Sequence, residues 1–496
     1  MPRHHAPLPA EVVREPLAFA GSPAALLGLL DEAQEPALLD SAAYHERYGR
    51  FSILACCPLE VLTLREGILR DRAGTVLAAG GDEAIWSALA RALGAVRVDG
   101  AAGASYVPGW IGYVGYEVAR HVERLPGAAA RDTHFPDLRL ALYDAMLVRD
   151  AREGRASLVE LRFASPPAGA GRGAAALREA LAAARDLPRA PLPERTDSAD
   201  GAPRRAVRDA RSNFSPAAYR RAVGRCIDYI AAGDVFQVNL SQRFEVRPSP
   251  EPRRIYQALR RRNPACYAAY LAFRSEGRPC AVLSSSPELF LRVRGREVLT
   301  RPIKGTRPRV GSPGADAAAR GELLASGKDN AELAMIVDLL RNDLGRLCEF
   351  GSIRVVEPRR LETHPTVFHL VATVAGTLRP DVGPADLLRA AFPGGSVTGA
   401  PKIRAMEIID EIEGLARGVY TGCIGIIGAD GSCEWNIAIR TILCDAGRAL
   451  VQVGGGIVAD SEPEAEARET LDKARAMFEA LAEARRGERL ARGAPR

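Results

Sequence analysis

Residues 391–413 read AFPGGSVTGAPKIRAMEIIDEIE, a glycine-rich turn that runs directly into an amphipathic helical pattern. Pro401 stands near the first turn of this helix, which is a favoured position for proline. The free N–H groups of a helix N-terminus suit a bound anion. A short loop with this much glycine, serine and threonine therefore predicts an anion-binding site. A plain tight turn is the alternative.

A second glycine-rich segment, residues 453–474, reads VGGGIVADSEPEAEARETLDKA. We expect the three successive glycines to end a strand and to leave backbone N–H groups open to a ligand. Glu466, Glu469 and Lys473 then share one side of the helix that follows. Ordinary ion pairing on a helix surface would also explain these charges.

A third segment, residues 328–347, has a helical pattern with carboxylates beside its apolar face. At 100° per residue, Asp329 falls within the apolar arc and Glu332 lies at its edge. Acidic residues near a helix start also interact favourably with the macrodipole. On an apolar face, however, a buried carboxylate needs a partner. A hard cation such as Mg²⁺, which takes oxygen ligands from one or two carboxylates, is one such partner.

Three further side chains stand in unusual surroundings. Lys304 lies in RPIKGTRPR, where the arginines nearby should lower the pKa of its amine and favour the nucleophilic form. Glu288 closes an apolar strand in SSSPELFL and is either a general acid or a turn residue. Gln237 alternates with apolar residues in GDVFQVNLS, which also suits a strand edge facing water. Taken singly, each segment also has an ordinary structural explanation.

The overall composition is that of a globular protein and argues against several classes. Hydrophobic residues make up 47% and charged residues 26% of the 496 residues. The net charge of +6 arises from 67 basic and 61 acidic residues, which indicates a mildly basic surface rather than a nucleic-acid-binding protein. The nine cysteines form no CxxC pair and suggest free thiols in a reducing compartment. Without a signal peptide or an apolar run of roughly 20 residues, we expect a cytoplasmic protein with no membrane contact.

The chain divides at one clear change of composition. Residues 165–211 are rich in Ala, Pro, Arg and Gly and are expected to be a linker, with a short helix at 173–185. This linker separates an N-terminal region, 10–164, from a C-terminal region, 212–487. Both regions mix helical and strand patterns without a strict βαβ alternation. Residues 22–33 have a helical pattern, and two alternating strand patterns around Gly154 predict a hairpin. A largely antiparallel α+β fold is therefore expected.

Together these segments resemble the chorismate-utilising enzymes. That family includes the synthase subunits of anthranilate synthase and aminodeoxychorismate synthase, the isochorismate synthases and the salicylate synthases. The resemblance rests on IVDLLRNDLGR, AFPGGSVTGAPKIRAMEIIDEIE, AIRT and GGGIVADSEPEAEARETLDKA, and covers residues 212–485. LLDSA, RFSILACCP and PGWIGYVGYE resemble the N-terminal half of the family more weakly. The resemblance implies a chorismate-binding-enzyme fold, a two-part layered antiparallel β-sandwich with outer helices.

The resemblance also implies a role for each matching position. Glu332 and Glu469 match magnesium-binding carboxylates, and Asp329 and Glu466 match supporting or alternative ligands. The metal and the backbone of two glycines would hold the ring carboxylate of chorismate. The remaining matches line the substrate pocket: Gly455 and Gly456 as the backbone donors, Arg440 and Tyr420 for the enolpyruvyl carboxylate, Ser396 and Thr398 in the wall, His369 as the pocket histidine, Gln237, Thr306 and Lys473 as further binding residues, and Glu288 as the general acid.

Residues at two positions distinguish the reactions of the members of this family. Water-using members carry a lysine base where this chain has Gln237, and a neutral amide cannot deprotonate water, so ammonia is the expected nucleophile. The motif reads PIAGTRPR in anthranilate synthases, whereas this chain has PIKGTRPR. Lys304 thus resembles the lysine of aminodeoxychorismate synthase that attacks C2 of chorismate. We expect amination at C4 without loss of pyruvate, for 4-aminobenzoate and folate synthesis. Synthesis of anthranilate and pyruvate is the alternative.

A glutamine-hydrolysing centre is not recognisable in the sequence. No GxCxG nucleophile elbow occurs among the nine cysteines, and Cys423 lies in a strand pattern with no histidine nearby. Ammonia should therefore come from a separate glutamine amidotransferase subunit. The segments that would bind feedback tryptophan, LLDS and NPACY, resemble the family only partly, which leaves tryptophan binding open.

Overall fold

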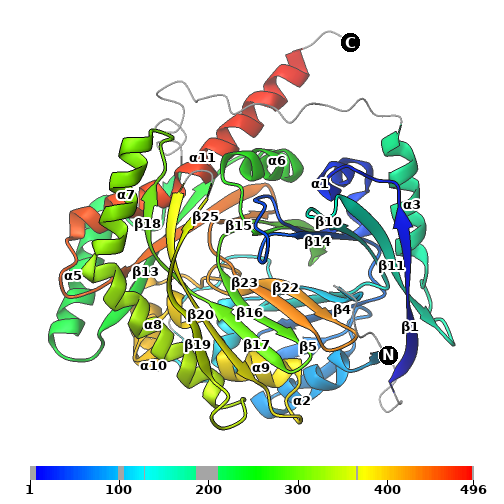
Figure 1. Cartoon of the computed structure of the whole chain (residues 1–496), viewed down its shortest axis with the longest axis horizontal. Coiled ribbons are helices and arrows are strands. Elements are labelled where there is room, and N and C mark those ends of the chain that lie inside the picture. The colour runs from blue at the N-terminus through cyan, green and yellow to red at the C-terminus, as the bar shows by residue number, and fades with distance from the viewer. Residues whose placement is uncertain (1–6, 99–105, 128, 186–209, 365–366, 494–496) are drawn as a thin grey trace.

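The computed structural model describes residues 7–98, 106–127, 129–185, 210–364 and 367–493. Two large sheets face one another and helices cover their outer sides (Figure 1). Within these residues, every pairing between named strands is antiparallel except that of β1 with β7. The expected α+β fold with an antiparallel sandwich is confirmed.

The first sheet lies uppermost in Figure 1 and contains strands from both ends of the chain. In spatial order its strands are β12 (Arg211–Ser212), β13 (Gln237–Val246), β25 (Arg448–Ile457), β24 (Thr441–Asp445), β15 (Arg278–Ser286), β14 (Tyr267–Ser275), β2 (Ala37–Asp40), β3 (Phe51–Ala55), β10 (Ala145–Asp150), β11 (Arg155–Phe163), β1 (Leu8–Leu17) and β7 (Val96–Val98), with β21 (Gly399–Ala400) beside β13.

The second sheet lies below the first and also draws on both regions. Its order is β18 (Ile303–Pro308), β20 (Val367–Thr377), β17 (Glu297–Arg301), β16 (Leu289–Arg294), β23 (Cys433–Ile437), β22 (Cys423–Gly428), β8 (Gly109–Val114), β9 (Leu138–Leu142), β4 (Glu60–Arg65), β5 (Ile68–Arg70) and β6 (Val76–Ala79), with β19 (Arg354–Thr363) beside β20.

The two regions of the chain meet within each sheet. In the first sheet, β2 pairs with β14 through Asp40 and Ala268. In the second, β8 pairs with β22 through Gly112 and Gly425. A core cluster between the sheets likewise takes residues from both regions, such as Tyr113. The N-terminal and C-terminal regions therefore share their sheets and their core.

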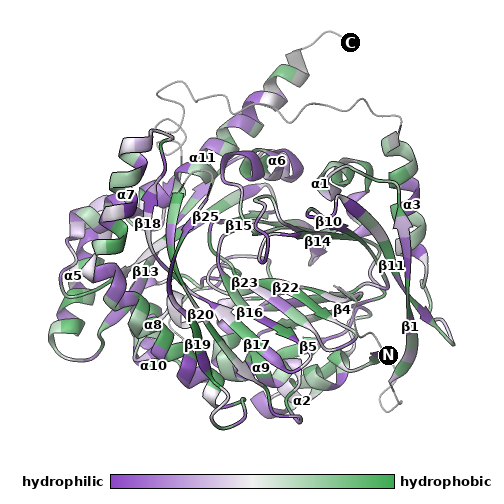
Figure 2. Cartoon of the chain, viewed as in Figure 1, coloured by the Kyte–Doolittle hydropathy of each residue, from purple (hydrophilic) through white to green (hydrophobic). Residues whose placement is uncertain are grey.

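The helices bury their apolar faces on the outer sides of the sheets, and polar residues face outward on helices such as α6 (Figure 2). Described helices are α1 (Pro23–Leu26), α2 (Asp82–Leu93), α3 (Arg172–Arg185), α5 (Pro216–Ala231), α6 (Pro252–Arg262), α7 (Pro313–Ala325), α8 (Gly327–Gly345), α9 (Pro384–Ala391), α10 (Lys402–Glu413) and α11 (Pro463–Gly493). Short 3₁₀ turns are η1 (Leu27–Leu29), η2 (Glu32–Gln34), η3 (Tyr116–His121) and η4 (Gly395–Val397).

Local sequence signals explain several of these boundaries. Helix α5 begins after Ser215, whose hydroxyl accepts from the Ala218 N–H, and has proline in its first turn. Gly414 ends α10 with a φ of 70°, the left-handed conformation that glycine adopts readily. The predicted hairpin around Gly154 is the β10–β11 pair. The helix expected at 173–185 is α3, while residues 186–209 of the expected linker lie outside the described residues.

One expected strand end was wrong. The glycine run at residues 454–456 does not end its strand but lies inside β25, opposite β13. Strand β24 follows the other edge of β25 only as far as Val451. The glycine part of β25 therefore has an edge beyond the reach of β24, so the expected availability of backbone N–H groups remains consistent with the fold.

Within the described residues, no helix is long and apolar enough to cross a membrane.

Candidate active site

Lys304 lies in β18, with only 11% of its side chain exposed. Helix α8 brings Glu332 alongside, so that its carboxylate oxygen is 3.9 Å from the lysine nitrogen. Glu288 precedes β16, and Glu469 and Lys473 belong to α11; all three act electrostatically on Lys304. The fold thus gathers, around one amine, charged groups that are far apart in the sequence.

Burial lowers the pKa of Lys304, and Lys473 lowers it further, against the opposing effect of the three carboxylates of Glu332, Glu288 and Glu469. The direction agrees with the sequence-based expectation, but the expected cause was wrong. The neighbouring arginines are engaged elsewhere: Arg301 with Glu362, Arg307 with Glu322 and Asp329, and Arg309 with Asp316. A buried amine with a lowered pKa is more often neutral and hence nucleophilic.

Glu288 is buried, and burial raises its pKa to about 7. The Ser396 side chain hydrogen-bonds to this carboxyl group, and Lys304 acts on it electrostatically; both partly oppose the rise in pKa. A carboxyl group with a pKa near neutrality can hold a proton and release it during a reaction. The general-acid role of Glu288 stays a prediction.

Glu466, Glu469 and Lys473 surround the backbone of Gly455 at the start of α11. A Cβ atom on Gly455 would lie 3.2 Å from an oxygen of Glu466 and 3.6 Å from the nitrogen of Lys473. Lys473 donates to the Gly454 carbonyl at 3.0 Å and pairs with Glu469 at 2.7 Å. Glycine therefore lets this backbone approach the charged groups closely.

The donor set fits a magnesium ion that shares its coordination with a substrate. Among the described residues, no three His, Cys, Asp or Glu side chains converge closely enough to hold a metal by themselves. Mg²⁺ commonly uses only one or two carboxylates and fills its remaining positions with water and substrate oxygens. Glu332 and Glu469, from two helices, offer such oxygens. Asp329 pairs with Arg307 at 3.2 Å, and Glu466 accepts from Ser461 at 2.6 Å, which suits supporting roles.

His369 lies beside Thr306 on the paired strands β20 and β18, with 2.9 Å between its Nδ1 and the threonine hydroxyl. Burial lowers the pKa of His369 well below its usual range, and Arg440 lowers it further. The imidazole is therefore neutral at physiological pH. Arg440 itself has a left-handed φ of 49° and donates to Asn263 at 3.2 Å. A guanidinium with few protein partners is suited to a carboxylate ligand.

Gln237 is fully buried, and neither amide atom has a hydrogen-bond partner among the described residues. Its Nε2 atom is 2.7 Å from the position that a Cβ on Gly456 would occupy. The alternative of a strand edge facing water is therefore wrong, because β13 is covered by β25, β21 and α10. An unpartnered buried amide is costly and points to a ligand.

The glycine loop before α10 forms a buried turn against α8 and β16. The Thr398 hydroxyl donates to the Gly394 carbonyl at 3.1 Å, and the Asn239 N–H donates to the Thr398 carbonyl at 2.8 Å. A Cβ on Gly395 would lie 2.3 Å from Leu339 of α8. Ser396 reaches Glu288, so the loop contributes directly to the site.

Comparisons with known proteins identify the family of the chain. Residues 40–479 match the family described as chorismate binding enzymes. The chain belongs to this family. It is 37% identical over 480 residues to anthranilate synthase component 1 of Pseudomonas aeruginosa, covering 94% of each chain. It is 40% identical over 365 residues to aminodeoxychorismate synthase component 1 of Salmonella typhimurium, covering 74% of this chain and 75% of that protein.

A solved structure extends the family relationship to the fold. The chain superposes on anthranilate synthase component I from Streptococcus pneumoniae with a TM-score of 0.71 and 30% identity. The match covers 93% of this chain and 98% of that one. The protein is therefore a chorismate-utilising enzyme, and relatives with two different products are comparably similar to it.

Some residues of this chorismate-binding enzyme were not found from its sequence. Arg417 is 1% exposed and donates to Glu413, to the carbonyls of Val397 and Asn239, and to Thr421. Its guanidinium thus ties the glycine loop to β13. An isolated arginine in GLARGVY carries no sequence signal of such burial. Tyr420, predicted to contact the enolpyruvyl carboxylate, lies beside Arg417 with 5.9 Å between guanidinium and ring, and its role stays a prediction.

The cysteines of this enzyme offer no evident glutaminase nucleophile. Of the nine free thiols, all but Cys57 are buried. Cys423 in β22 is fully buried, and burial raises its pKa. A thiol in this state is a poor nucleophile.

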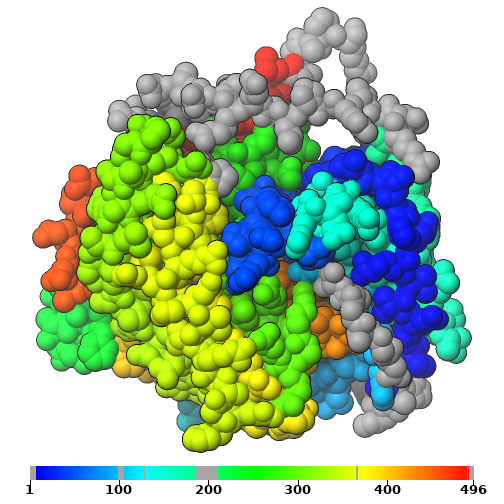
Figure 3. Space-filling model, viewed as in Figure 1, coloured from blue at the N-terminus to red at the C-terminus, as the bar shows by residue number. Residues whose placement is uncertain are grey.

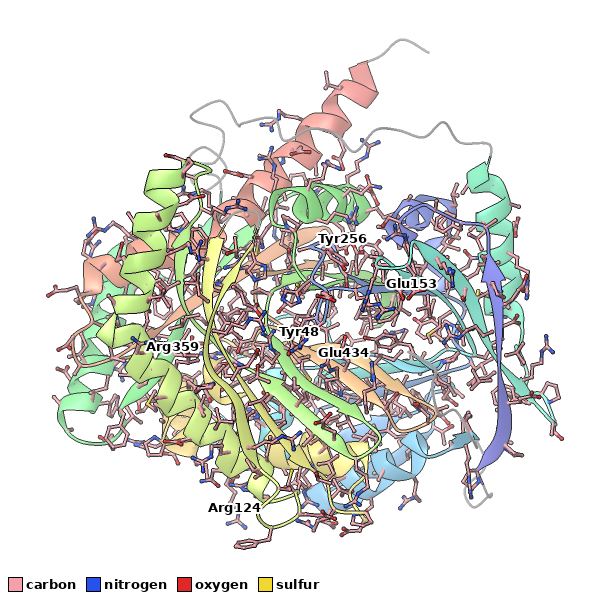
Figure 4. All side chains as sticks on the ribbon, viewed as in Figure 1. Tyr48, Arg124, Glu153, Tyr256, Arg359 and Glu434 are labelled. Carbon is pink, nitrogen blue, oxygen red and sulfur yellow. The ribbon has the colours of Figure 1, made fainter. Side chains whose placement is uncertain are left out.

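A separate cavity of about 260 Å³ opens where the N-terminal and C-terminal regions meet on the face shown in Figure 3. Tyr48 and Glu434, which line it, lie near the centre of the view in Figure 4. Its lining contains none of the predicted catalytic residues. Nearby, Asp40 of the LLDS segment is already engaged by Arg260 at 2.8 Å and Tyr256 at 3.1 Å.

Proposed function

We propose that this chain is the synthase subunit of aminodeoxychorismate synthase, which replaces the C4 hydroxyl of chorismate with an amino group. The observation that carries the proposal is the buried amine of Lys304, with its lowered pKa, close to the buried acid Glu288. The anthranilate-synthase motif has alanine in place of Lys304. Alanine has no nucleophile, so the difference is chemical.

The reaction proceeds in two displacements. The neutral Lys304 amine attacks ring C2, the ring double bond shifts, and the C4–oxygen bond breaks. Glu288 gives its proton to the departing oxygen, which leaves as water. Ammonia then forms a bond to C4, the double bond shifts back, and the C2–nitrogen bond to Lys304 breaks. The net change is chorismate plus ammonia to 4-amino-4-deoxychorismate plus water, and the enolpyruvyl group is retained.

The remaining site residues bind and orient the substrate. Glu332 and Glu469, supported by Asp329 and Glu466, are the proposed holders of Mg²⁺. When bound, this ion would neutralise and fix the ring carboxylate. The backbone of Gly455 and Gly456 faces the same carboxylate. Arg440, with Tyr420, binds the enolpyruvyl carboxylate, while neutral His369 and Thr306 line the pocket. Gln237 cannot act as a base toward water, which favours ammonia as the nucleophile.

The proposed source of ammonia is a separate glutamine amidotransferase subunit. Both relatives cited above are named as components 1, which suggests enzymes of more than one component. Burial of Cys423 also argues against glutamine hydrolysis at that thiol. The product would pass to 4-aminobenzoate and folate synthesis in the cytoplasm.

Anthranilate synthesis is the second candidate. Several of the most similar relatives carry that name, including one that matches 94% of the chain. In that reaction ammonia would add at C2, pyruvate would leave, and Lys304 would be a bystander.

One experiment separates the two candidates. Wild type and Lys304→Ala are each incubated with chorismate, Mg²⁺ and ammonium. Products are identified by chromatography, and the intact proteins are weighed by mass spectrometry during turnover. Lys473→Met serves as a control that removes a nearby amine without removing the nucleophile.

The proposed function predicts aminodeoxychorismate from wild type, without pyruvate. It also predicts a covalent species whose added mass is that of chorismate less one water, absent in Lys304→Ala but still able to form in Lys473→Met. The Lys304→Ala variant should lose most of the amination at C4. Anthranilate and pyruvate from wild type would contradict the proposal, and the family assignment would survive.

A further inference from the structure

The basic residues of the chain are distributed very unevenly between lysine and arginine. Of 67 such residues, four are lysines: Lys304, Lys328, Lys402 and Lys473. Arginine therefore serves at nearly every surface and ion-pair position. The two side chains are not equivalent, because an ammonium is a compact point charge and a guanidinium is a larger planar fork. Positions that keep lysine in such a chain deserve a functional explanation.

Three of the four lysines face the carboxylates of the active site. Lys304 lies 3.9 Å from Glu332, and Lys473 pairs with Glu469 at 2.7 Å. Lys328, in the first turn of α8, acts electrostatically on Glu466 and Glu469. The fourth, Lys402, faces none of these carboxylates, and no role has so far been given to it.

Lys402 is the first residue of α10 and joins three elements at one point. Its ammonium donates to Asp343 of α8 at 2.7 Å and to the Ala391 carbonyl at the end of α9 at 3.4 Å. The two charged side chains are 13% and 4% exposed. A cation at a helix N-terminus opposes the helix dipole, so this position does not serve the stability of α10 itself.

The elements joined by Lys402 carry the two halves of the substrate site. Helix α8 carries Glu332, and the loop between α9 and α10 carries Ser396 and Thr398. The same loop presses Gly395 against Leu339 of α8, where a Cβ would come within 2.3 Å. The contact between α8 and the loop is therefore tight, and Lys402 bonds to α8 through Asp343 where the loop enters α10.

We propose that Lys402 is a positioning residue for chorismate, whose ammonium holds the glycine loop in place against the helix that carries Glu332. The inference rests on the family's use of chorismate and holds for either product considered above. A 1 Å displacement between these elements would separate Ser396 and Glu288 from the groups on α8, and displacements of this size can cost about 100-fold in rate.

Arginine does not substitute for this lysine. The ammonium makes two contacts in a narrow, sheltered space, to one carboxylate oxygen and one carbonyl. A guanidinium has five N–H donors in a fixed plane and would leave several unpaired there, or push the loop away from α8.

The test uses chorismate consumption with ammonium as the nitrogen source, so it does not depend on which product forms. Lys402→Met removes the charge and keeps most of the stem, and Lys402→Arg keeps the charge. The matched control is Arg120→Met, which breaks another sheltered ion pair of α10, that of Arg120 with Asp410, with side chains 22% and 5% exposed. For each protein, kcat, the KM for chorismate and the thermal midpoint of unfolding are measured.

We expect Lys402→Met to lose about 100-fold in kcat/KM, and Lys402→Arg about 10-fold with nearly unchanged stability. Arg120→Met should lose stability comparable to that of Lys402→Met but keep kcat/KM within about threefold. If Lys402→Met does not fold, Lys402→Met combined with Asp343→Leu leaves no unpaired buried carboxylate and should show the same loss of kcat/KM. Equal losses of kcat/KM in Lys402→Met and Arg120→Met would overturn the proposal, as would wild-type kcat/KM in Lys402→Arg.

Discussion

Glu117 and Glu288 are buried glutamates whose pKa is raised to about 7, mainly by burial, yet their surroundings differ. Glu117, in η3 of the N-terminal region, accepts backbone N–H bonds from Arg417 and Gly418, each at 2.8 Å. Glu288 faces the Ser396 side chain and the amine of Lys304.

The comparison shows that a shifted pKa alone does not identify a catalytic group. The carboxylate oxygens of Glu117 are bound to a fixed loop, so its role is to hold the chain segment that carries Arg417. Glu288 instead has the ionisable amine of Lys304 as a neighbour. A group that can exchange a proton with a ligand needs a partner that is not already part of the backbone framework.

A pair of matched substitutions distinguishes the roles of the two glutamates most clearly. Glu288→Gln should lower kcat for chorismate about 10²- to 10⁴-fold, because the amide cannot protonate the leaving oxygen. Glu117→Gln, isosteric in the same way, should leave kcat within a few-fold and act on the free energy of unfolding. Steady-state kinetics and urea unfolding of both variants provide the measurement. Similar losses of kcat in the two variants would remove the distinction.

Substitutions in the Arg417 network, next to Glu117, should lower the free energy of unfolding more than substitutions around Glu288. Arg417→Met leaves Glu413, 3% exposed, without its guanidinium partner, and should cost about 3–5 kcal/mol in the free energy of unfolding. Urea unfolding would measure this loss. Combining Arg417→Met with Glu413→Leu removes both charges and should recover part of it. A loss below about 1 kcal/mol in the single variant would show that the network is not coupled as described.

The pH dependence should report Glu288 rather than Glu117. Once the Lys304 amine is neutral, activity depends on protonated Glu288, so kcat should then fall about tenfold per pH unit above a pH of about 7. Both glutamates also stabilise the fold below their unfolded pKa of about 4.5, and this contribution is lost as the pH rises toward 7. In a pH–rate profile, Glu288→Gln should abolish the alkaline limb and Glu117→Gln should retain it.

A smaller effect on kinetics is expected where the Gln237 side chain lies against Gly456 of β25. Gly456→Ala would place a methyl group 2.7 Å from the Gln237 amide, which is the flexible end of a side chain and can shift. We expect a rise of several-fold in the KM for chorismate or ammonium and little loss of stability. A neighbouring control is Gly454→Ala, which would instead meet the Leu240 carbonyl at 2.5 Å and should chiefly destabilise the sheet. The reverse pattern would argue against Gln237 as a substrate-facing group.

The smallest effect should come from an exposed ion pair. Arg354 and Glu297 are each 57% exposed and 2.7 Å apart. Arg354→Ala should change the free energy of unfolding by less than about 1 kcal/mol and leave kcat unchanged. This substitution gives the loss of unfolding free energy expected from an exposed ion pair, with which the losses at buried groups are compared. A loss above about 1 kcal/mol would show that exposed pairs in this protein contribute more than assumed.

The sequence predicted the fold well because its periodic segments are long. Helices α8 and α10 begin within one residue of the patterns that predicted them, and the β10–β11 hairpin lies where its turn residues indicated. In contrast, the pattern at residues 22–33 broke into α1 and two 3₁₀ turns, because Asp31 caps a new turn there. A propensity summed over a short window cannot anticipate such a cap.

The motifs predicted which residues form the candidate site. They did not predict the causes of the pKa shifts within it. The structure places Lys304, Glu288 and Glu332 together, but the cause of the lysine's lowered pKa depends on burial, which neighbouring letters do not reveal. Arg417 and Lys402 were missed because their partners lie on other elements. Contacts of this kind become visible only when the sheets and helices are assembled.

The interleaving of the two regions within each sheet has a consequence for the making of the protein. Strand β2 can pair with β14, and β8 can pair with β22, only after the ribosome has added the later strand of each pair. Until then the early strands offer unpaired edges to any neighbouring chain. Sheets assembled from such distant segments fold slowly. The nascent chain is therefore exposed to aggregation until its later strands are made, and helper proteins that shield strand edges should raise its yield.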